Sequence, residues 1–368
     1  MRFPEFSGEW KMCTIGELIT KVGCGVTPRG GEAVYKTEGH PFVRSQNVGL
    51  GNLLLDDIAF IDEETHLRQK NTELQFNDVL LNITGASIGR SALVDKQIVG
   101  GNVNQHVCII RTKENLVPSF ICSFLLSNYG QRQIDSFQAG GNRQGLNFEQ
   151  IKSIKITIPS KDEQIKIAKL LRAIDERIAT QNKIIDKLQS LIKGIAQNVA
   201  RNNKPNIRLS ECLECSSSTL QESDVCKNGT YPVYGANGIV GYLDNYNTEK
   251  EAVYIIKDGS GVGTVSYVTG KCSATGTLNT LQAKEGYSLQ YLYYMLKVFN
   301  FEPYKTGMAI PHIYFKDYGK AKIFCPSYTE QLKYARLLSA IDNKLSAEQS
   351  ILTDLSLQKQ YLLRQMFI

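Results

Sequence analysis

Apolar residues follow a heptad pattern in two segments of the chain. Alternating steps of four and three residues from Ile167 to Val199 meet nine apolar residues and one glutamine. The same steps from Tyr334 to Met366 meet apolar residues except at Glu348, and at a lysine near the end. Such spacing, sustained over about five heptads, is typical of coiled-coil helices. Two long helices, each with one apolar seam, are therefore predicted.

The two heptad segments belong to an internal repeat. The segment Pro159–Ile178 recurs as Pro326–Leu345, displaced by 167 residues, and Asp175 and Asp342 are one of several identical pairs. The same displacement extends both upstream and downstream, whereas the match weakens in the earlier part of each copy. A repeat of this kind indicates two copies of one structural unit. The predicted order is domain, helix, domain, helix.

Each predicted helix has a start signal. Ser160 and Glu163 form the Ser-x-x-Glu pattern of a capping box, and Ser327 and Glu330 repeat it. In a capping box the serine hydroxyl accepts a backbone N–H, and the glutamate carboxylate accepts the N–H of the cap residue. The sequence Asn-Asn-Lys-Pro at 202–205 is expected to end the first helix.

The second domain carries the chain from the end of the first helix to the start of the second. A helix of about 37 residues is roughly 55 Å long, whereas a domain of about 120 residues has a radius of gyration near ~14 Å. These lengths favour an antiparallel helix pair with one domain at each end of a rod. The seam residues Gln181 and Glu348 would then meet at the middle, where we expect a shared polar layer to fix the register.

Short β-type runs between glycine and asparagine predict an α+β fold for both domains. The strands expected in the first domain are 41–44, 78–82, 105–110 and 154–158. Helical patches are expected at 118–129 and 289–297. The predicted fold class is two strand-rich α+β domains joined by an antiparallel coiled coil, with an internal pseudo-twofold repeat. The expected boundaries are 1–158 for the first domain, 159–204 for the first helix, 205–325 for the second domain and 326–368 for the second helix.

Tyrosine is concentrated in the second domain, where 14 of the 18 tyrosines lie between Tyr231 and Tyr328. Tyrosine with Asn, Ser and Gly is typical of an adaptable recognition surface, and it suits the core of a sheet equally well. The sequence leaves both interpretations open.

The composition is that of an ordinary globular protein, with 42% hydrophobic and 21% charged residues. No apolar run approaches about 18 residues, so no membrane span is predicted. The first residues lack the apolar stretch of a secretory signal, which predicts a cytoplasmic protein. The nine cysteines are odd in number and scattered, so we expect free thiols rather than disulfides.

Motifs that would indicate catalysis or metal binding are incomplete. The stretch Gly259-x-Gly261-x-Gly263 lacks the rest of a dinucleotide fingerprint, since Thr264 follows and a strand-like run comes next. The sequence has neither a phosphate-binding P-loop nor the Asn-Pro-Pro-aromatic stretch of an amino-methyltransferase. Cys212-x-x-Cys215 is half of a zinc knuckle, and the four histidines form no metal or triad pattern. No catalytic residue, metal site or cofactor is predicted for this chain.

The duplicated order of elements resembles the specificity subunit of type I restriction-modification systems. In both copies a strand-rich unit leads to Ile-Pro or Cys-Pro, and then to Ser-x-x-Glu-Gln at the start of a heptad helix that contains Ala-Ile-Asp. The beginning, Arg2–Trp10, and the segment Tyr231–Gly238 are also typical of that family. The resemblance covers the whole chain.

The resemblance implies a non-catalytic DNA reader. Each domain would recognise one half of a bipartite, asymmetric double-stranded DNA target, and the helices would set the spacer between the halves. Two methyltransferase subunits would bring S-adenosylmethionine chemistry, and restriction and translocase subunits would bring ATP and Mg²⁺ chemistry. No membrane partner is implied.

Candidate DNA contacts are polar residues in glycine-punctuated stretches, because Arg, Asn, Gln and hydroxyl side chains read base edges. In the first domain they are Arg44, Asn47, Thr84, Ser87, Arg90, Asn104, Gln105, Arg143 and Gln144. In the second domain they are Asn237, Lys257, Ser260, Thr264, Lys305 and His312. Arg143, Gln144, Lys305 and His312 are preferred, since they lie in equivalent loops before the strand that leads into each helix.

The net charge of +6 lies almost entirely on the first helix. Residues 1–160 and 205–326 are neutral overall, whereas 161–204 hold 10 basic and 5 acidic residues. A protein that binds DNA alone is expected to have a basic domain. We therefore expect weak DNA binding by the isolated chain, with the basic helix facing partner subunits or the spacer DNA.

Three alternatives stay open. The domains could bind protein or glycan as an interaction scaffold, or the glycine-rich loops could serve a self-contained enzyme. The same architecture could also serve a methylation system without a nuclease. The sequence determines neither the DNA target nor the spacer length.

Overall fold

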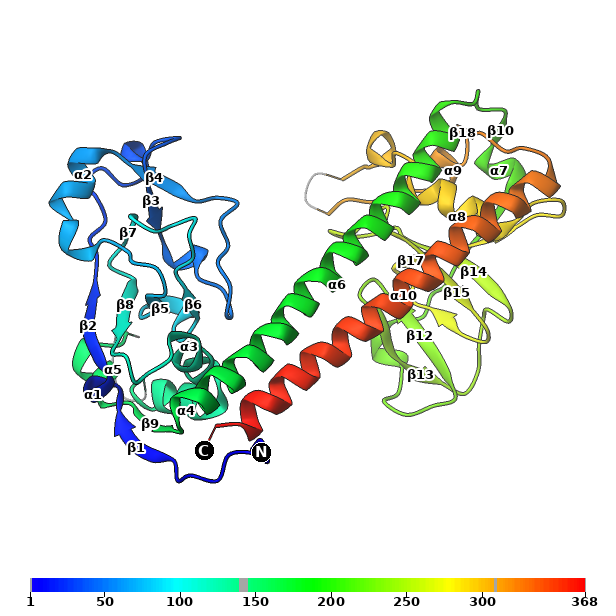
Figure 1. Cartoon of the computed structure of the whole chain (residues 1–368). Helices are drawn as coiled ribbons and strands as arrows, with labels where there is room; N and C mark the ends of the chain where they lie inside the picture. Colours follow the sequence, from blue (N-terminus) through cyan, green and yellow to red (C-terminus); the bar gives the residue numbers. More distant parts are fainter. Residues whose placement is uncertain (1, 139–144, 308–309, 368) are drawn as a thin grey trace. The chain divides into compact units, whose positions relative to one another are not determined.

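The computed structural model describes residues 2–138, 145–307 and 310–367. The chain divides into two compact units: unit 1 is Met1–Gln181 with Ile351–Ile368, and unit 2 is Asn182–Ser350. The division falls within both long helices, α6 (Lys161–Arg201) and α10 (Tyr328–Gln365). Each unit therefore contains one strand-rich region and part of both long helices (Figure 1).

Unit 1 contains three small sheets. A four-stranded antiparallel sheet has the order β2 (Ile19–Cys24), β8 (Val107–Thr112), β5 (Val79–Asn82) and β6 (Ser91–Leu93). A three-stranded sheet has the order β4 (Ala59–Ile61), β3 (His40–Val43) and β7 (Asn102–Val103), with β7 parallel to β3. The third sheet pairs β1 (Lys11–Thr14) with β9 (Lys155–Ile158). All four strands predicted for the first domain are present, with ends shifted by one or two residues.

Unit 2 repeats these three sheets in the same order. Its four-stranded sheet is β11 (Leu213–Ser217), β17 (Leu278–Ala283), β14 (Glu251–Ile256) and β15 (Val265–Thr269). Its three-stranded sheet is β13 (Gly238–Leu243), β12 (Tyr231–Gly235) and β16 (Ser273–Ala274), with β16 parallel to β12. The third sheet pairs β10 (Ile207–Arg208) with β18 (Lys322–Ile323). The repeat therefore extends through the domains, where the sequence match is weak.

Short helices connect the strands. In unit 1 they are α1 (Ile15–Leu18), α2 (Glu63–Arg68), α3 (Pro118–Leu126), α4 (Asn128–Ser136) and α5 (Phe148–Ser153). In unit 2 they are α7 (Leu209–Cys212), α8 (Leu289–Lys297) and α9 (Phe315–Tyr318). The 3-10 helices are Gly31–Val34, Ser45–Asn47, Lys70–Thr72, Gly85–Ser87, Glu222–Asp224 and Glu302–Tyr304.

The helical patch predicted at 118–129 is two helices rather than one. Ser127 has extended backbone with φ −72° and ψ 164°, which ends α3. Its hydroxyl accepts the backbone N–H of Gly130 at 3.3 Å and caps α4. A serine that caps a new helix interrupts an otherwise apolar helical run. The patch predicted at 289–297 coincides with α8.

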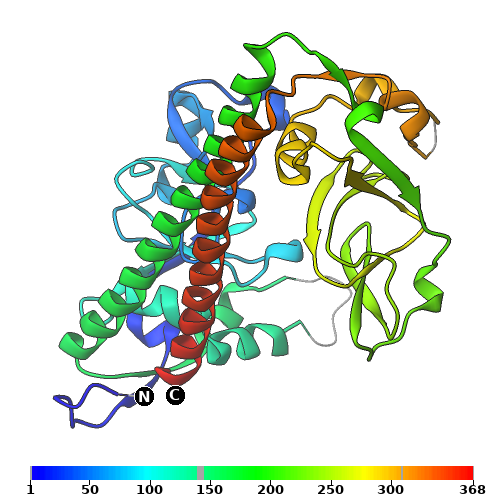
Figure 2. The ribbon, with the colours of Figure 1, turned by 90° about the vertical axis from the view of Figure 1, so that its right-hand side faces the viewer.

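The heptad seams of α6 and α10 are buried, as predicted. Every seam position from Ile167 to Val199 and from Tyr334 to Met366 is buried or half-buried. In unit 1, Leu171 near the start of α6 belongs to the same core cluster as Leu362 near the end of α10. In unit 2 the later part of α6 lies beside the early part of α10 (Figures 1 and 2). The helices are thus antiparallel within each unit.

Each predicted capping box is only half formed. The Ser160 hydroxyl accepts the backbone N–H of Glu163 at 3.4 Å, but the Glu163 carboxylate accepts from Nε and Nη2 of Arg2, each at 2.8 Å. In the second copy the Glu330 carboxylate accepts the backbone N–H of Ser327 at 3.3 Å, and the Ser327 hydroxyl donates to the same carboxylate. The N-terminal arginine, which has no counterpart in the second copy, accounts for the first difference.

Tyrosines of unit 2 serve both as core and as surface residues. Tyr254, Tyr291 and Tyr318 are at most 1% exposed, which matches the sheet-core interpretation. The rings of Tyr231 and Tyr246 are half-buried or exposed and form an edge-to-face pair beneath the ammonium of Lys271. All nine cysteines are free thiols. No helix in the part of the chain that the structure describes is long and apolar enough to cross a membrane.

Candidate nucleic-acid interface

In unit 1 the loops that follow β3, β5 and β7 meet. The buried side chain of Asn82, at the end of β5, donates to the Ser45 carbonyl oxygen at 2.8 Å and to the Ser87 hydroxyl at 3.1 Å. This amide joins the loop after β3 to the loop after β5. The candidate residues Ser87 and Arg90 lie in the second loop, where Ser87 is half-buried and Arg90 is exposed.

A chain of hydrogen bonds links candidate residues of these loops through His106. The Thr84 hydroxyl lies 2.5 Å from His106 Nδ1, and the amide nitrogen of Gln105 lies 3.0 Å from His106 Nε2. The amide oxygen of Gln105 accepts the backbone N–H of Thr27 at 3.0 Å. Gln105 is exposed and Thr84 half-buried. The structure therefore brings Thr84 and Gln105 together at one rim of unit 1.

Two other candidates of unit 1, Arg44 and Asn47, are committed to internal contacts. Asn47 has no exposed surface, and its amide donates to Leu54 O and to the Asp57 carboxylate, each at 2.9 Å. The Arg44 guanidinium donates to Asp57 O at 2.7 Å and lies over the Tyr35 ring. These contacts hold the loop after β3 in shape, so in this conformation Asn47 has no surface to offer a base.

The remaining candidates of unit 1 are Asn104, which is buried, and Arg143 and Gln144. The Asn104 side chain is 6% exposed and accepts the backbone N–H of His106 at 3.0 Å, so it shapes the loop that carries His106. Arg143 and Gln144 lie outside the described residues. Gly145, just after them, forms an isolated bridge with Thr84.

In unit 2 the corresponding loops meet at Asp258 and His312. His312 Nδ1 lies 2.7 Å from an Asp258 carboxylate oxygen, and the two residues form an isolated bridge. The backbone N–H of Ile313 donates to the carbonyl oxygen of Lys257 at 2.9 Å. Lys257 is half-buried, whereas Ser260 and Thr264 further along the loop are exposed. Lys257 and His312 are therefore brought together, and Ser260 follows Lys257 in the same loop.

The two other candidates of unit 2 are Asn237 and Lys305. Asn237 is exposed in the turn between β12 and β13. Lys305 is half-buried, and its ammonium forms a 2.6 Å ion pair with Glu302, one helical turn earlier. Neither side chain has a hydrogen bond to the Asp258–His312 pair within the described residues.

His106, Asp258, Thr27 and Asn82 take part in these networks but were not among the sequence candidates. The signal that could have found two of them is positional: Asn82 and Asp258 follow or end a strongly apolar strand. The sequence places His106 only against metal and triad patterns, because its partner Thr84 and the Thr27 that Gln105 contacts are distant in sequence. Only the fold shows that these positions converge.

The two residues predicted to fix the register of the helix pair, Gln181 of α6 and Glu348 of α10, are both buried. Gln181 is 7% exposed and Glu348 6% exposed, and Glu348 forms an ion pair with Lys344 on the same helix. They belong to different units, so a layer shared between them stays a prediction. Within unit 1 the two helices are joined by an ion pair of 2.5 Å between Asp175 of α6 and Lys359 of α10.

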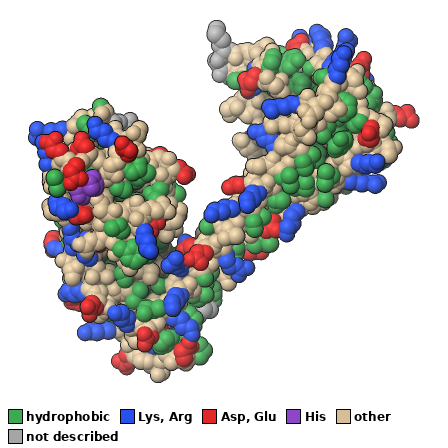
Figure 3. All heavy atoms as spheres, turned by 45° about the horizontal axis from the view of Figure 1, so that its top comes forward, with side chains coloured by type: hydrophobic (Ala, Val, Ile, Leu, Met, Phe, Trp, Pro, Cys, Tyr) green, Lys and Arg blue, Asp and Glu red, His purple; other side chains and the backbone are tan. Residues whose placement is uncertain are grey.

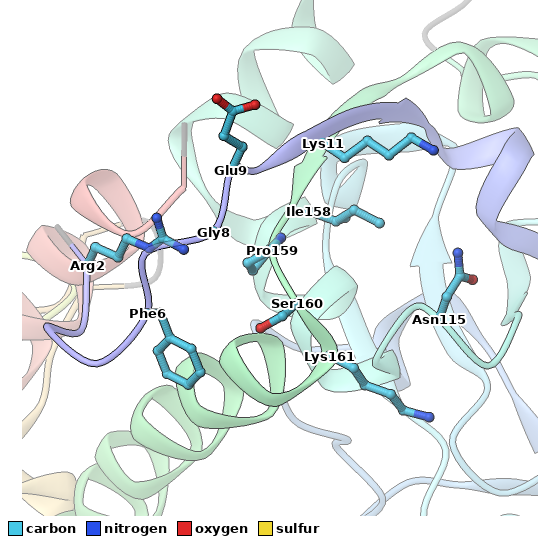
Figure 4. A pocket seen from close by; sticks show the side chains of 10 residues that line it. All are labelled: Arg2, Phe6, Gly8, Glu9, Lys11, Asn115, Ile158, Pro159, Ser160 and Lys161. Carbon is cyan, nitrogen blue, oxygen red and sulfur yellow. The ribbon is translucent and has the colours of Figure 1, made fainter.

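A cavity of about 450 Å³ in unit 1 lies where the N-terminal segment crosses the start of α6 (Figure 4). Its polar lining includes Arg2, Glu9, Lys11 and Lys161, without a histidine, a cysteine or a pair of carboxylates. The residues that line the cavity therefore include no nucleophile paired with a base.

The cysteines give no metal centre among the described residues, where no three of the side chains His, Cys, Asp and Glu are grouped to hold an ion. Burial raises the pKa of the Cys212 thiol to about 12 and that of Cys215 to about 11. Cys212 is the last residue of α7, and Cys215 lies in β11.

Charged side chains of both signs are interspersed on the face of unit 1 that Figure 3 shows. This distribution agrees with the neutral total of residues 1–160. Unit 1 therefore presents on this face a mixed surface rather than one basic patch.

The comparisons with known proteins identify the family. The profile of the family described as "Type I restriction modification DNA specificity domain" matches residues 7–190 and again 205–356. The chain belongs to this family. It is a DNA specificity subunit, the non-catalytic part of a type I restriction-modification complex.

Relatives with the same description cover different shares of the chain. A type I specificity subunit of Mycoplasma genitalium is 25% identical over 320 residues, which is 79% of this chain and 81% of that protein. The EcoKI specificity subunit of Escherichia coli is 22% identical over 202 residues, 52% of this chain and 41% of that protein.

The fold is shared with a solved structure. A crystal structure of a type I restriction-modification S subunit from M. genitalium superposes with a TM-score of 0.67 at 18% identity, and the match covers 100% of this chain and 97% of that one. The α+β fold class with two strand-rich regions and two long helices is thereby confirmed.

Proposed function

We propose that the two strand-rich regions, 1–158 and 205–325, are target-recognition domains that each read one half of a bipartite, asymmetric DNA sequence. The observation that supports this most is a repeated scaffold with different loop side chains. Both units have the same strand order, yet Thr84 and Gly145 in unit 1 are replaced by Asp258 and His312 at the matching bridge of unit 2. A repeated scaffold with unlike reading groups suits an asymmetric site.

The proposed base contacts are the exposed or half-buried members of the converging loops. They are Thr84, Ser87, Arg90 and Gln105 in unit 1, and Lys257, Ser260, Thr264 and His312 in unit 2. Arg143 and Gln144 remain candidates from the sequence. Arg44, Asn47 and Asn104 would act indirectly, because their side chains hold the loops in shape. Asn237 and Lys305 are better suited to contacts with the phosphate backbone of the DNA. Such contacts position the protein on the duplex without reading the base sequence.

The helices 159–204 and 326–368 would set the spacer between the half-sites and recruit two methyltransferase subunits. Those subunits would supply S-adenosylmethionine chemistry, and restriction and translocase subunits would supply chemistry that needs ATP and Mg²⁺. The basic excess of α6 gives this helix a surface for partner subunits or for the phosphates of the spacer DNA.

Mapping of methylated adenines tests the proposal. The chain is expressed with its methyltransferase subunits in a host that lacks adenine methylation, and the genome is sequenced by a method that detects the modified base. We expect one motif with two unlike half-sites and a fixed spacer of arbitrary sequence. A palindromic or continuous motif would contradict reading by two different domains.

A protein or glycan scaffold is the second candidate function. The aromatic pair of half-buried Tyr231 and exposed Tyr246, beneath Lys271, is the observation that favours it, since such groups are common at recognition surfaces. Retention of duplex DNA of one sequence by the assembled complex, in the presence of excess unrelated DNA, would decide against it.

A further inference from the structure

Both units contain the same backbone bridge at the point where their loops converge. In unit 1 it joins Thr84 to Gly145, and in unit 2 it joins Asp258 to His312. The flanking hydrogen bonds also match: Leu146 N donates to Ile83 O at 2.8 Å, and Ile313 N donates to Lys257 O at 2.9 Å. Gly145 and His312 are separated by 167 residues, the displacement of the helix repeat. The bridge is therefore an equivalent position of the two copies.

The side chains at this shared position differ completely. Unit 2 has a carboxylate and an imidazole there, whereas unit 1 has a hydroxyl and a glycine. In unit 1 the Thr84 hydroxyl instead contacts the imidazole of His106, which comes from the loop between β7 and β8. His106 is engaged at both ring nitrogens. A position with constant backbone and variable side chains is where a duplicated reader would encode its difference.

The imidazole of His312 is fixed at one end. A carboxylate only accepts hydrogen bonds, so Nδ1 of His312 is the donor in its 2.7 Å contact with Asp258. Nε2 has no hydrogen bond within the described part of the chain, and the side chain is 34% exposed. The pair therefore leaves one polar ring atom for a ligand.

The backbone around His312 is held on two sides. His312 and Thr306 exchange backbone hydrogen bonds of 2.8 and 2.9 Å, and Gly259 N donates to Pro311 O at 3.0 Å. Gly307, which follows Thr306, has φ +88°, a conformation that favours glycine. A reading group held by rigid neighbours loses little freedom on binding, which improves discrimination.

We propose that His312 is a specificity-determining residue of unit 2, which hydrogen-bonds through Nε2 to the edge of one base, and that Asp258 is its positioning residue. The inference rests on the proposed function, since it assigns one base contact to a domain that reads one half-site. Thr84 and His106 would be the corresponding but chemically different group of unit 1. The exchange of one reading group would change one half-site and leave the other unchanged.

The test uses the full complex of this chain with its methyltransferase subunits and a library of randomised duplex DNA as the probe. His312→Ala is expected to lower discrimination at one base pair of one half-site by about 5- to 150-fold. Asp258→Asn is expected to weaken discrimination at the same base pair by a smaller factor. His312→Gln keeps a donor for Asp258 and is expected to change the preferred base there, which also covers the case in which the alanine variant folds poorly.

A matched control is available in unit 1. His40 Nε2 forms a 2.6 Å pair with the Glu63 carboxylate, outside the converging loops, so His40→Asn makes a similar change without an expected effect on the motif. An unchanged motif in the His312→Ala and His312→Gln complexes, or an even loss over both half-sites, would overturn the inference. A wild-type complex without any bipartite motif would instead overturn the proposed function.

Discussion

The side-chain amide of Gln331 accepts the backbone N–H of Ser288 at 2.9 Å, at the residue that caps α8. Gln164, its repeat partner, accepts the N–H of Val117, the residue before α3, at the same distance. Both glutamines also donate to the proline carbonyl before their own helix. These matched contacts of the two copies thus attach each domain to its helix.

Loss of this attachment is expected to destabilise the chain. The Gln164 side chain is 1% exposed, so Gln164→Ala removes the partner of the half-buried Val117 N–H and of the buried Pro159 carbonyl. We expect the free energy of unfolding to fall by about 3 kcal/mol in urea titrations followed by circular dichroism. Gln189→Ala on the exposed face of α6 is the control, with an expected change within about 0.5 kcal/mol. Equal stabilities of the two variants would refute the attachment.

A glycine sets how closely the loop after β2 approaches β7. A Cβ atom at Gly25 would overlap the carbonyl oxygen of Val103, whereas a Cβ at Gly23 meets no atom within 4 Å. We expect Gly25→Ala to lower stability by about 3 kcal/mol and to displace Thr27 from Gln105. Gly23→Ala is the control and should leave the melting temperature close to that of the wild type. Identical melting curves for both variants would contradict this close approach.

Thiol reactivity should report the burial of the cysteines. Burial raises the pKa of Cys108 and Cys212 to about 12 and that of Cys122 to about 11. At pH 8 the reactive thiolate is then about one part in a thousand or less. The exposed Cys226 is expected to react first with iodoacetamide, as followed by peptide mass spectrometry. Modification of folded Cys212 as fast as Cys226 would contradict the packing, and unfolding in urea should make all the cysteines reactive.

The isolated chain is expected to bind DNA weakly. Residues 1–160 and 205–326 carry no net charge, so phosphate neutralisation contributes little to their affinity. Fluorescence anisotropy with duplex DNA at physiological salt should give a Kd in the micromolar range or weaker. Nanomolar binding by the purified chain alone would show that the domains do not depend on partner subunits.

Sequence periodicity predicted the helices well because coiled-coil packing is local and regular. The seam from Ile167 to Val199 is buried as expected, and Pro205 lies shortly after α6 ends at Arg201. The capping box at Ser160 and Glu163 formed only in part, because Arg2 binds the Glu163 carboxylate. The sequence around Glu163 does not show that Arg2 is close in space. The sequence did not predict the ion pair between Lys359 and Asp175. Asp175 lies in the first half of α6 and Lys359 near the end of α10, so the two residues are far apart in the sequence.

The candidate interface was harder to predict, because polarity and turn composition do not determine burial. Asn47 has the residue type of a base reader but is fully buried. Asp258 was not a candidate, because its role depends on a bridge to His312, 54 residues later. The repeat displacement of 167 residues makes His312 equivalent to Gly145. Their bridge partners, Asp258 and Thr84, become visible only in the fold.

Dependence on the spacer tests most directly the claim that two domains of one chain read two half-sites at a fixed separation. The assembled complex is titrated with its mapped target and with the same target lengthened by one base pair between intact half-sites. One added base pair moves the half-sites apart by about 3.4 Å along the DNA axis and rotates one relative to the other about that axis. We therefore expect at least a tenfold loss of affinity. Equal affinity for both duplexes would contradict reading by two domains held at a fixed spacing.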